Sequence, residues 1–107
     1  MDKFNFGDIV LLKFPYTDNK TFKRRPALII NDFRDGDVIV CRITSQIYKT
    51  NNDVLIPNWE NSGLKLQSVI RVHKLATLDK DLIELYMGKI DNSLKEKVIK
   101  ILSKITE

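Results

Sequence analysis

A basic segment near the N-terminus carries side chains that are suited to contact phosphate groups. Residues 16–25 contain turn-forming residues and show no apolar periodicity, which predicts an exposed loop. Two aromatic residues, Tyr16 and Phe22, stand among its positive charges, which are Lys20, Lys23, Arg24 and Arg25. Cations that follow phosphates, together with rings that stack bases, are typical of a platform for single-stranded nucleic acid. A solvated loop that only aids solubility has the same composition, so both interpretations stay open here.

Pro26 follows Arg25 and restricts the backbone conformation of Arg25. A proline biases the residue before it towards an extended conformation, so Arg25 is expected at the entrance to a strand. A guanidinium is planar, and its paired donors match two phosphate oxygens. The alternative for Arg25 is a solvated charge beside a proline.

His73 is the only histidine in the chain, and it follows Arg71 by two positions on a predicted strand. Residues two apart on a strand point to the same face, so we expect these two side chains together. An imidazole titrates near neutrality and could move a proton during a reaction. The alternative is a partly buried histidine that a neighbouring group satisfies.

The remaining titratable residues offer no metal site. One histidine, one cysteine and no clustered carboxylates give no recognisable zinc geometry, so neither a metal nor another cofactor is expected. Cys41 lies in an apolar run, where a buried and unreactive thiol is the expected state. A serine hydrolase is disfavoured because the chain has no Gly-x-Ser-x-Gly turn.

Short strands and one helix must position these side chains. Apolar and β-branched runs bounded by turn residues predict strands at 9–14, 27–30, 38–44, 54–56, 68–75 and 82–90. The last run also suits a helix, but a short turn at 79–81 followed by a strand is favoured. Residues 58–66 are expected to form a loop with room for one helical turn.

The C-terminal segment has the pattern of an amphipathic helix. Ser93, with Glu96 three residues later, is predicted to form a capping box at its start. Its apolar stripe consists of Leu94, Val98, Ile101, Leu102 and Ile105, with four lysines outside the stripe. The elements together predict a mainly β protein, a small barrel with a C-terminal α-helix packed on it.

The bulk composition narrows the class of protein. A chain of 107 residues has room for one core, so residues 1–107 are expected to form a single domain. The net charge of +4 only weakly favours a polyanionic partner. No signal-peptide pattern and no apolar run of membrane-spanning length is visible, and the lone cysteine suits a reducing compartment. A cytoplasmic protein without a membrane partner is therefore expected, and a dimer would bury a further face of so small a barrel.

Four blocks of sequence, in order along the chain, resemble the MazF/PemK family of toxins. They are residues 7–18 (GDIVLLKFPYTD), 24–30 (RRPALII), 43–46 (ITSQ) and 68–79 (SVIRVHKLATLD). The Gly88-Lys89 pair before the helix also fits. The blocks cover nearly the whole chain, and their common order is more specific than any one of them.

The resemblance implies an SH3-like barrel that forms a homodimer and acts as the endoribonuclease toxin of a toxin–antitoxin system. Such a toxin cleaves single-stranded RNA without a metal, through attack by the ribose 2′-hydroxyl, and a cognate antitoxin silences it. Arg25 matches the family's catalytic arginine, and Thr44 matches its active-site threonine. His73 stands where one branch of the family has a carboxylate tied to catalysis, so it is the third candidate catalytic residue. The expected RNA-binding residues are Lys20, Lys23, Arg24, Ser45, Gln46 and Arg71.

The chain departs from the family pattern in two places. Residues 19–23 replace the common Gly-Ser-Glu-Gln stretch, so a loop carboxylate of some members is missing. Ala76 stands where the family usually has an arginine before Thr77. Both changes fall near the expected RNA-contacting surface and put its sequence preference in doubt.

A non-catalytic toxin of the gyrase-poison type, or an SH3-like barrel that only binds nucleic acid, is the alternative function. Both would act by contact and would not need a threonine hydroxyl beside a guanidinium. Thr44 could equally be a strand end hydrogen-bonded to its own backbone. The nuclease hypothesis therefore requires that Arg25 and Thr44 share one cleft.

Overall fold

Strands make up about half of the computed structural model, which describes residues 3–15 and 20–106. The strands are β1 (Asp8–Pro15), β2 (Phe22–Asp32), β3 (Asp37–Thr44), β4 (Asp53–Ile56), β5 (Ser68–Asp79) and β6 (Ile83–Lys89). Two short 3-10 helices, η1 (Trp59–Ser62) and η2 (Lys80–Leu82), precede β5 and β6, and one α-helix, α1 (Asn92–Ile105), ends the fold. The predicted mainly β protein with one C-terminal helix is confirmed.

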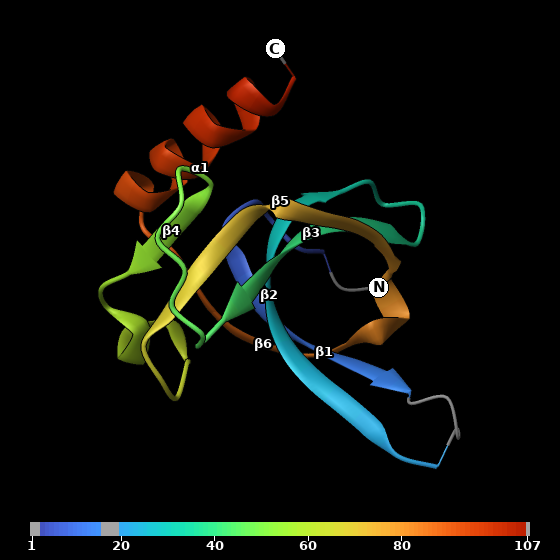
Figure 1. Cartoon of the computed structure of the whole chain (residues 1–107). Coiled ribbons are helices and arrows are strands. Elements are labelled where there is room, and N and C mark those ends of the chain that lie inside the picture. Colours follow the sequence, from blue (N-terminus) through green and yellow to red (C-terminus); the bar gives the residue numbers. More distant parts are fainter. Residues whose placement is uncertain (1–2, 16–19, 107) are drawn as a thin grey trace.

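The six strands form one antiparallel sheet in the order β4-β5-β3-β2-β1-β6. Register shifts in three of the strand pairs would be expected to bend the sheet, and it curls into a barrel-like shape (Figure 1). β4 and β6 are the two edges, and no hydrogen-bonded ladder joins them within the described part of the chain. The sheet is therefore not a closed barrel.

The end of η1 packs against β6. Gly63 follows η1 with a φ of +80°, and a Cβ at this position would overlap the carbonyl oxygen of Met87. A Cβ on Gly88 would come within 2.7 Å of the carbonyl oxygen of Ser62. The two backbones thus touch directly, which only glycine permits here. We call this contact between residues 62–63 and 87–88 the glycine seam.

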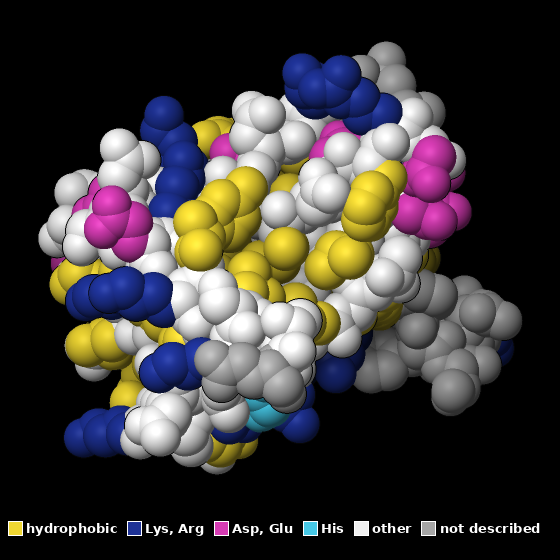
Figure 2. Space-filling model, turned by 90° about the horizontal axis from the view of Figure 1, so that it is seen from above, with side chains coloured by type: hydrophobic (Ala, Val, Ile, Leu, Met, Phe, Trp, Pro, Cys, Tyr) yellow, Lys and Arg dark blue, Asp and Glu magenta, His cyan; other side chains and the backbone are white. Residues whose placement is uncertain are grey.

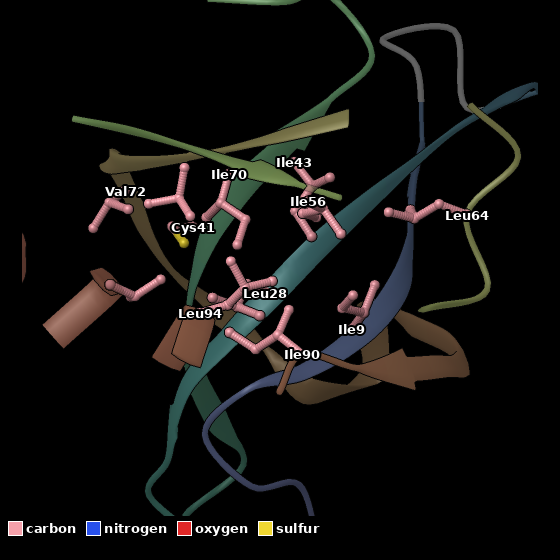
Figure 3. Packing of buried hydrophobic residues seen from close by; sticks show 12 residues of the cluster. Ile9, Leu28, Cys41, Ile43, Ile56, Leu64, Ile70, Val72, Ile90 and Leu94 are labelled. Atoms are coloured by element: carbon pink, nitrogen blue, oxygen red, sulfur yellow. The ribbon is translucent and has the colours of Figure 1, made fainter. Parts of the chain in front are cut away.

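Two clusters of buried side chains cover the two faces of the curled sheet. The larger cluster includes Ile9, Leu28 and Ile70, and Leu94 from α1 points into it (Figure 3). The smaller cluster includes Val10, Ala27, Ile29 and Val38 on the opposite face of the same strands. Because β1 and β2 are buried on both faces, their apolar runs lack the alternation of a half-buried strand.

α1 lies over β4 and β5, and Leu94 and Val98 form its buried side. The Asp91 carboxylate caps the helix, accepting a 2.9 Å hydrogen bond from the Leu94 N–H. The predicted cap at Ser93 is wrong, because the helix starts earlier and places Ser93 in its first turn.

The face seen from above, on the side of α1, shows hydrophobic side chains gathered at its centre (Figure 2). None of the described helices has the length and apolar character needed to span a membrane.

β2 and β5 are both longer than the strands predicted at 27–30 and 68–75. β2 begins at Phe22 because Lys23 to Arg25 pair with β1, so the predicted loop is wrong for residues 22–25, and residues 16–19 lie outside the described part. β5 continues to Asp79 because it pairs with the start of β3. The turn predicted at 79–81 is the η2 helix, and the strand predicted after it is confirmed as β6.

A buried ion pair ties η2 to the end of β2. The Lys80 Nζ lies 2.9 Å from Asp32 Oδ1, and the two side chains are 9% and 1% exposed. The backbone N–H of Phe4 donates to the same carboxylate at 2.9 Å, as does that of Arg34. The hydrogen bond from Phe4, opposed by burial and joined by the bonds from Lys80 and Arg34, lowers the pKa of Asp32 to about 2.

Candidate functional site

A groove of about 600 Å³ lies where β2 enters the sheet and β3 leaves it. Arg24 and Arg25 line it from β2, and Thr44, Ser45 and Gln46 line it from the end of β3. Further walls come from Leu11 of β1, from Met87 of β6 and from the segment before β5, which contributes Leu64, Lys65, Leu66 and Ser68. We call this cleft the arginine groove.

Arg25 and Thr44 lie just beyond the end of the β2–β3 ladder. The ladder ends at the pair Ala27–Arg42, and each of the two residues follows that pair by two positions along its strand. An unbroken antiparallel register would bring them opposite each other. Both residues line the arginine groove, so the condition that the nuclease hypothesis required is met.

Each of the two side chains retains capacity to bind a ligand. The exposed guanidinium of Arg25 donates one 2.9 Å hydrogen bond, from Nη1 to the carbonyl oxygen of Arg24. The Thr44 hydroxyl oxygen accepts a 3.2 Å bond from the Gln46 N–H, as the structural alternative for Thr44 expected. A hydroxyl keeps a donor hydrogen and a second lone pair after accepting one bond. Thr44 can therefore hold its turn and still contact a phosphate oxygen.

The arginine groove is strongly cationic. Its basic lining residues are Arg24, Arg25, Arg42 and Lys65, and no described lining residue is acidic. Arg24 is partly neutralised, because its Nε lies 2.8 Å from Glu84 Oε2. Arg25 has no carboxylate within ion-pair distance among the described residues. The Arg25 guanidinium is thus available to an anionic ligand.

Two lining cations, Arg42 and Lys65, did not figure among the residues predicted for the site. Arg42 precedes Thr44 by two residues on β3, so strand alternation could have placed it on the same face. Lys65 lies in the segment between η1 and β5, and no sequence pattern brings that segment to the strand ends. Its place follows from the glycine seam, which positions the neighbouring backbone.

Three residues predicted to bind RNA lie elsewhere. Lys20 and Lys23 do not line the arginine groove, and Lys23 lies in β2 beside Phe14 of β1. The Nε of Arg71 lies 2.9 Å from Asp53 Oδ1, and its guanidinium carbon lies 3.6 Å from the centre of the Tyr48 ring. The Arg71 side chain is 11% exposed, so most of its surface is already covered by protein.

His73 also lies outside the arginine groove. The β3–β5 ladder slips between the Cys41–Leu75 and Arg42–Arg71 pairs, which leaves residues 72–74 without partners on β3. His73 is half-buried in this bulge, and its Nδ1 is buried with no hydrogen-bond partner in the described structure. The acid–base role of His73 stays a prediction.

The cysteine and the carboxylates offer no further reactive centre. Cys41 is fully buried, and burial raises the pKa of its thiol to about 12. A thiol of this pKa is protonated at neutral pH and is a poor nucleophile. In the part of the chain that is described, no three His, Cys, Asp or Glu side chains are grouped to hold a metal ion.

Comparisons with known proteins agree with this fold. The model of the family described as "PemK-like, MazF-like toxin of type II toxin-antitoxin system" matches residues 5–106. No curated protein matches the chain. Among solved structures, a MazE–MazF structure from Deinococcus radiodurans is similar with a TM-score of 0.79 and 19% identity, covering 95% of this chain and 94% of that one.

Two mycobacterial structures are similar as well. An endoribonuclease in complex with its cognate antitoxin from a mycobacterial species has a TM-score of 0.74 and 18% identity, covering 92% of this chain and 90% of that one. The Mycobacterium tuberculosis toxin MazF-mt6 has a TM-score of 0.71 and 17% identity, covering 89% and 93%. At this level of identity the structural likeness concerns the fold, while the family match extends over nearly the whole sequence. The chain therefore belongs to the PemK-like, MazF-like toxin family of type II toxin–antitoxin systems.

Proposed function

We propose that this chain is a metal-independent endoribonuclease that cleaves single-stranded RNA and thereby stops translation and growth. The observation that carries the proposal is that Arg25 and Thr44 line one groove, whose described charged lining residues are all basic. A phosphodiester is an anionic group whose oxygens fit a guanidinium fork and a hydroxyl together. The same cations disfavour a divalent metal ion at this position, which supports chemistry by positioning and charge stabilisation alone.

In the proposed reaction, the ribose 2′-oxygen attacks the adjacent phosphorus. A bond forms between phosphorus and the 2′-oxygen, and the bond to the 5′-oxygen breaks. The 2′-hydroxyl loses its proton and the leaving 5′-oxygen gains one, so the products are a 2′,3′-cyclic phosphate and a 5′-hydroxyl. Arg25 stabilises the extra negative charge on the phosphorane oxygens, and Thr44 fixes one of these oxygens in place.

Ser45 and Gln46 continue the wall of the groove beyond Thr44, and both are exposed. We propose that they contact the RNA beside the scissile phosphate, together with Arg24 on the opposite wall. Lys20 and Lys23 contribute at longer range, because exposed cations near a binding groove attract RNA without contacting it. This long-range attraction falls as salt increases.

An antitoxin and a second copy of the chain are the proposed protein partners. The names of two similar structures describe a MazE–MazF complex and an endoribonuclease with its cognate antitoxin. A groove that attracts RNA also suits an acidic peptide segment, since both present negative charge. An antitoxin segment in the arginine groove would inhibit the toxin by excluding RNA.

Cleavage of a long RNA by the purified protein in EDTA tests the proposal. We expect fragments with 2′,3′-cyclic phosphate and 5′-hydroxyl ends, and primer extension then reports the preferred sites. Thr44→Val removes the hydroxyl at nearly constant volume and is expected to lower the rate at least tenfold, whereas Thr44→Ser retains most activity. RNA binding without any cleavage would instead favour the non-catalytic binder, which needs neither side chain for chemistry.

A further inference from the structure

A second groove of about 750 Å³ adjoins the arginine groove. It is lined by residues 47–50, which follow β3, and by residues of β4 and the start of β5. Tyr48 and Lys49 are its aromatic and cationic lining residues. We call it the Tyr48 groove.

The two grooves share the same two chain segments. Gln46 lines the arginine groove and the next residue, Ile47, lines the Tyr48 groove. On the other side, Leu66 and Ser68 line the first groove, while Gln67 lines the second. The grooves are therefore neighbours, separated only by these segments. A chain-like ligand bound at Thr44 reaches the Tyr48 groove by following the loop.

The ring of Tyr48 is held in position before any ligand binds. Its face packs on the guanidinium of Arg71, with 3.6 Å from the guanidinium carbon to the ring centre. Arg71 is fixed in turn by Asp53, whose carboxylate also accepts bonds from the Thr50 N–H at 2.9 Å and the Thr50 hydroxyl at 2.6 Å. A ring that is already ordered loses little conformational freedom on stacking with a base.

The charge of the Tyr48 groove suits a nucleic acid backbone. Lys49 is exposed in its lining. Asp53 is the acidic residue among the described lining residues, and its side chain is 2% exposed and paired with Arg71. Burial opposes ionisation of Asp53, but the bonds from Thr50 and Arg71 outweigh it and lower the pKa of this carboxyl. Asp53 is thus ionised at neutral pH, and its paired partner Arg71 offsets its negative charge.

We propose that the Tyr48 groove binds a nucleotide flanking the scissile phosphate, with the Tyr48 ring stacking on its base and Lys49 facing the backbone. Arg71 is then a positioning residue that holds the ring, in place of the direct RNA contact expected from the sequence. The inference rests on the proposed nuclease function and adds a residue that sets binding strength and the register of cleavage. RNA is the favoured occupant because the groove continues the cleft that holds Arg25 and Thr44.

Binding of an uncleavable RNA probe tests this inference apart from catalysis. The probe is a fluorescein-labelled pool of 2′-O-methyl oligonucleotides, eight nucleotides long and random in sequence, followed by fluorescence anisotropy. Tyr48→Ala is expected to weaken binding about tenfold, the effect of losing one stacked base, while Tyr48→Phe keeps the ring and the affinity. Tyr86→Ala is the matched control, since Tyr86 is 53% exposed on β6 and lines neither groove.

A second measurement protects the test against local unfolding in Tyr48→Ala. Ultraviolet crosslinking of the unmodified protein to the same pool, followed by mass spectrometry, should locate an adduct on Tyr48. Unchanged affinity in Tyr48→Ala, or crosslinks that spare residues 47–50, would overturn the inference while leaving the nuclease proposal intact. If Tyr48→Ala keeps its RNA affinity but sediments as a smaller species, the groove is a contact between copies. A protein that neither binds the pool nor cuts RNA in EDTA would overturn both proposals.

Discussion

Replacing Arg25 by alanine should lower the rate of the proposed reaction while leaving the fold unchanged. The Arg25 side chain is exposed, and the hydrogen bond that it donates returns to the carbonyl oxygen of the preceding residue. Removing it leaves no buried group unpaired and opens no cavity. We therefore expect the free energy of unfolding to change by less than about 0.5 kcal/mol, as for an ordinary surface substitution.

The effect on the reaction should be far larger. In the proposed mechanism Arg25 contacts the phosphorane oxygens, where charge develops only in the transition state. Loss of one such donor from a preorganised site lowers kcat by about 10² to 10³-fold. Single-turnover cleavage of a labelled RNA in EDTA measures this rate, and urea unfolding of the same samples checks the fold. Arg25→Lys retains the charge but not the fork, and should recover only part of the rate.

Arg24→Ala is the matched control, because it removes the same charge from the adjacent residue. Arg24 is already engaged by Glu84 at 2.8 Å, in an exposed pair of the kind that contributes less than about 1 kcal/mol to stability. We expect this variant to lose less than tenfold in rate, mainly through weaker RNA binding. The assignment is refuted if Arg25→Ala cleaves within threefold of the unsubstituted protein, or if Arg24→Ala is equally impaired.

Three further predictions concern other parts of the molecule. His73 lies outside the groove, so His73→Gln should leave the shape of the pH–rate profile for RNA cleavage unchanged. Loss of one limb of that profile would instead show that His73 acts as an acid or a base in the reaction. The pKa of Asp32 is lowered from 3.8 to about 2, so the carboxylate contributes about 2 kcal/mol that is present above pH 4 and lost as the pH falls towards 2. Urea unfolding across this range should show that extra loss in the unsubstituted protein and not in Asp32→Asn. Gly36→Ala is expected to lower the free energy of unfolding by roughly 1 kcal/mol, because its φ is positive but the added Cβ meets open space. Gly63→Ala should lower it by more, because a positive φ is combined with overlap on Met87, and thermal melts of both variants measure the difference.

Strands could be predicted from the sequence where the burial of apolar side chains alone determines them. The run at 38–44 and the short run at 54–56 correspond to β3 and β4 within one residue at each end. The start of β2 could not be predicted, because residues 23–25 are all charged and become strand through pairing with β1. The helix cap was misplaced because Asp91 and Ser93 are both good capping residues, and tertiary packing decides which one the chain uses.

The candidate site was only partly predictable for the same reason. Arg25 and Thr44 could be proposed from family resemblance, but their encounter depends on a β2–β3 register that no local pattern specifies. Arg71 was expected to face RNA, yet its position beside Asp53 depends on the β4–β5 pairing. His73 was placed by strand alternation, and a bulge in β5 breaks that alternation at residues 72–74.

The glycine seam affects how one wall of the arginine groove is held in place. Met87 belongs to the seam, Leu64 directly follows it, and both line the arginine groove, so this wall of the groove adjoins a van der Waals contact between two backbones. A hydrogen-bonded ladder resists separation over its whole length, whereas such a contact yields once its surfaces part. This wall of the groove is accordingly held by packing, and a side chain at position 63 or 88 would push the two backbones apart.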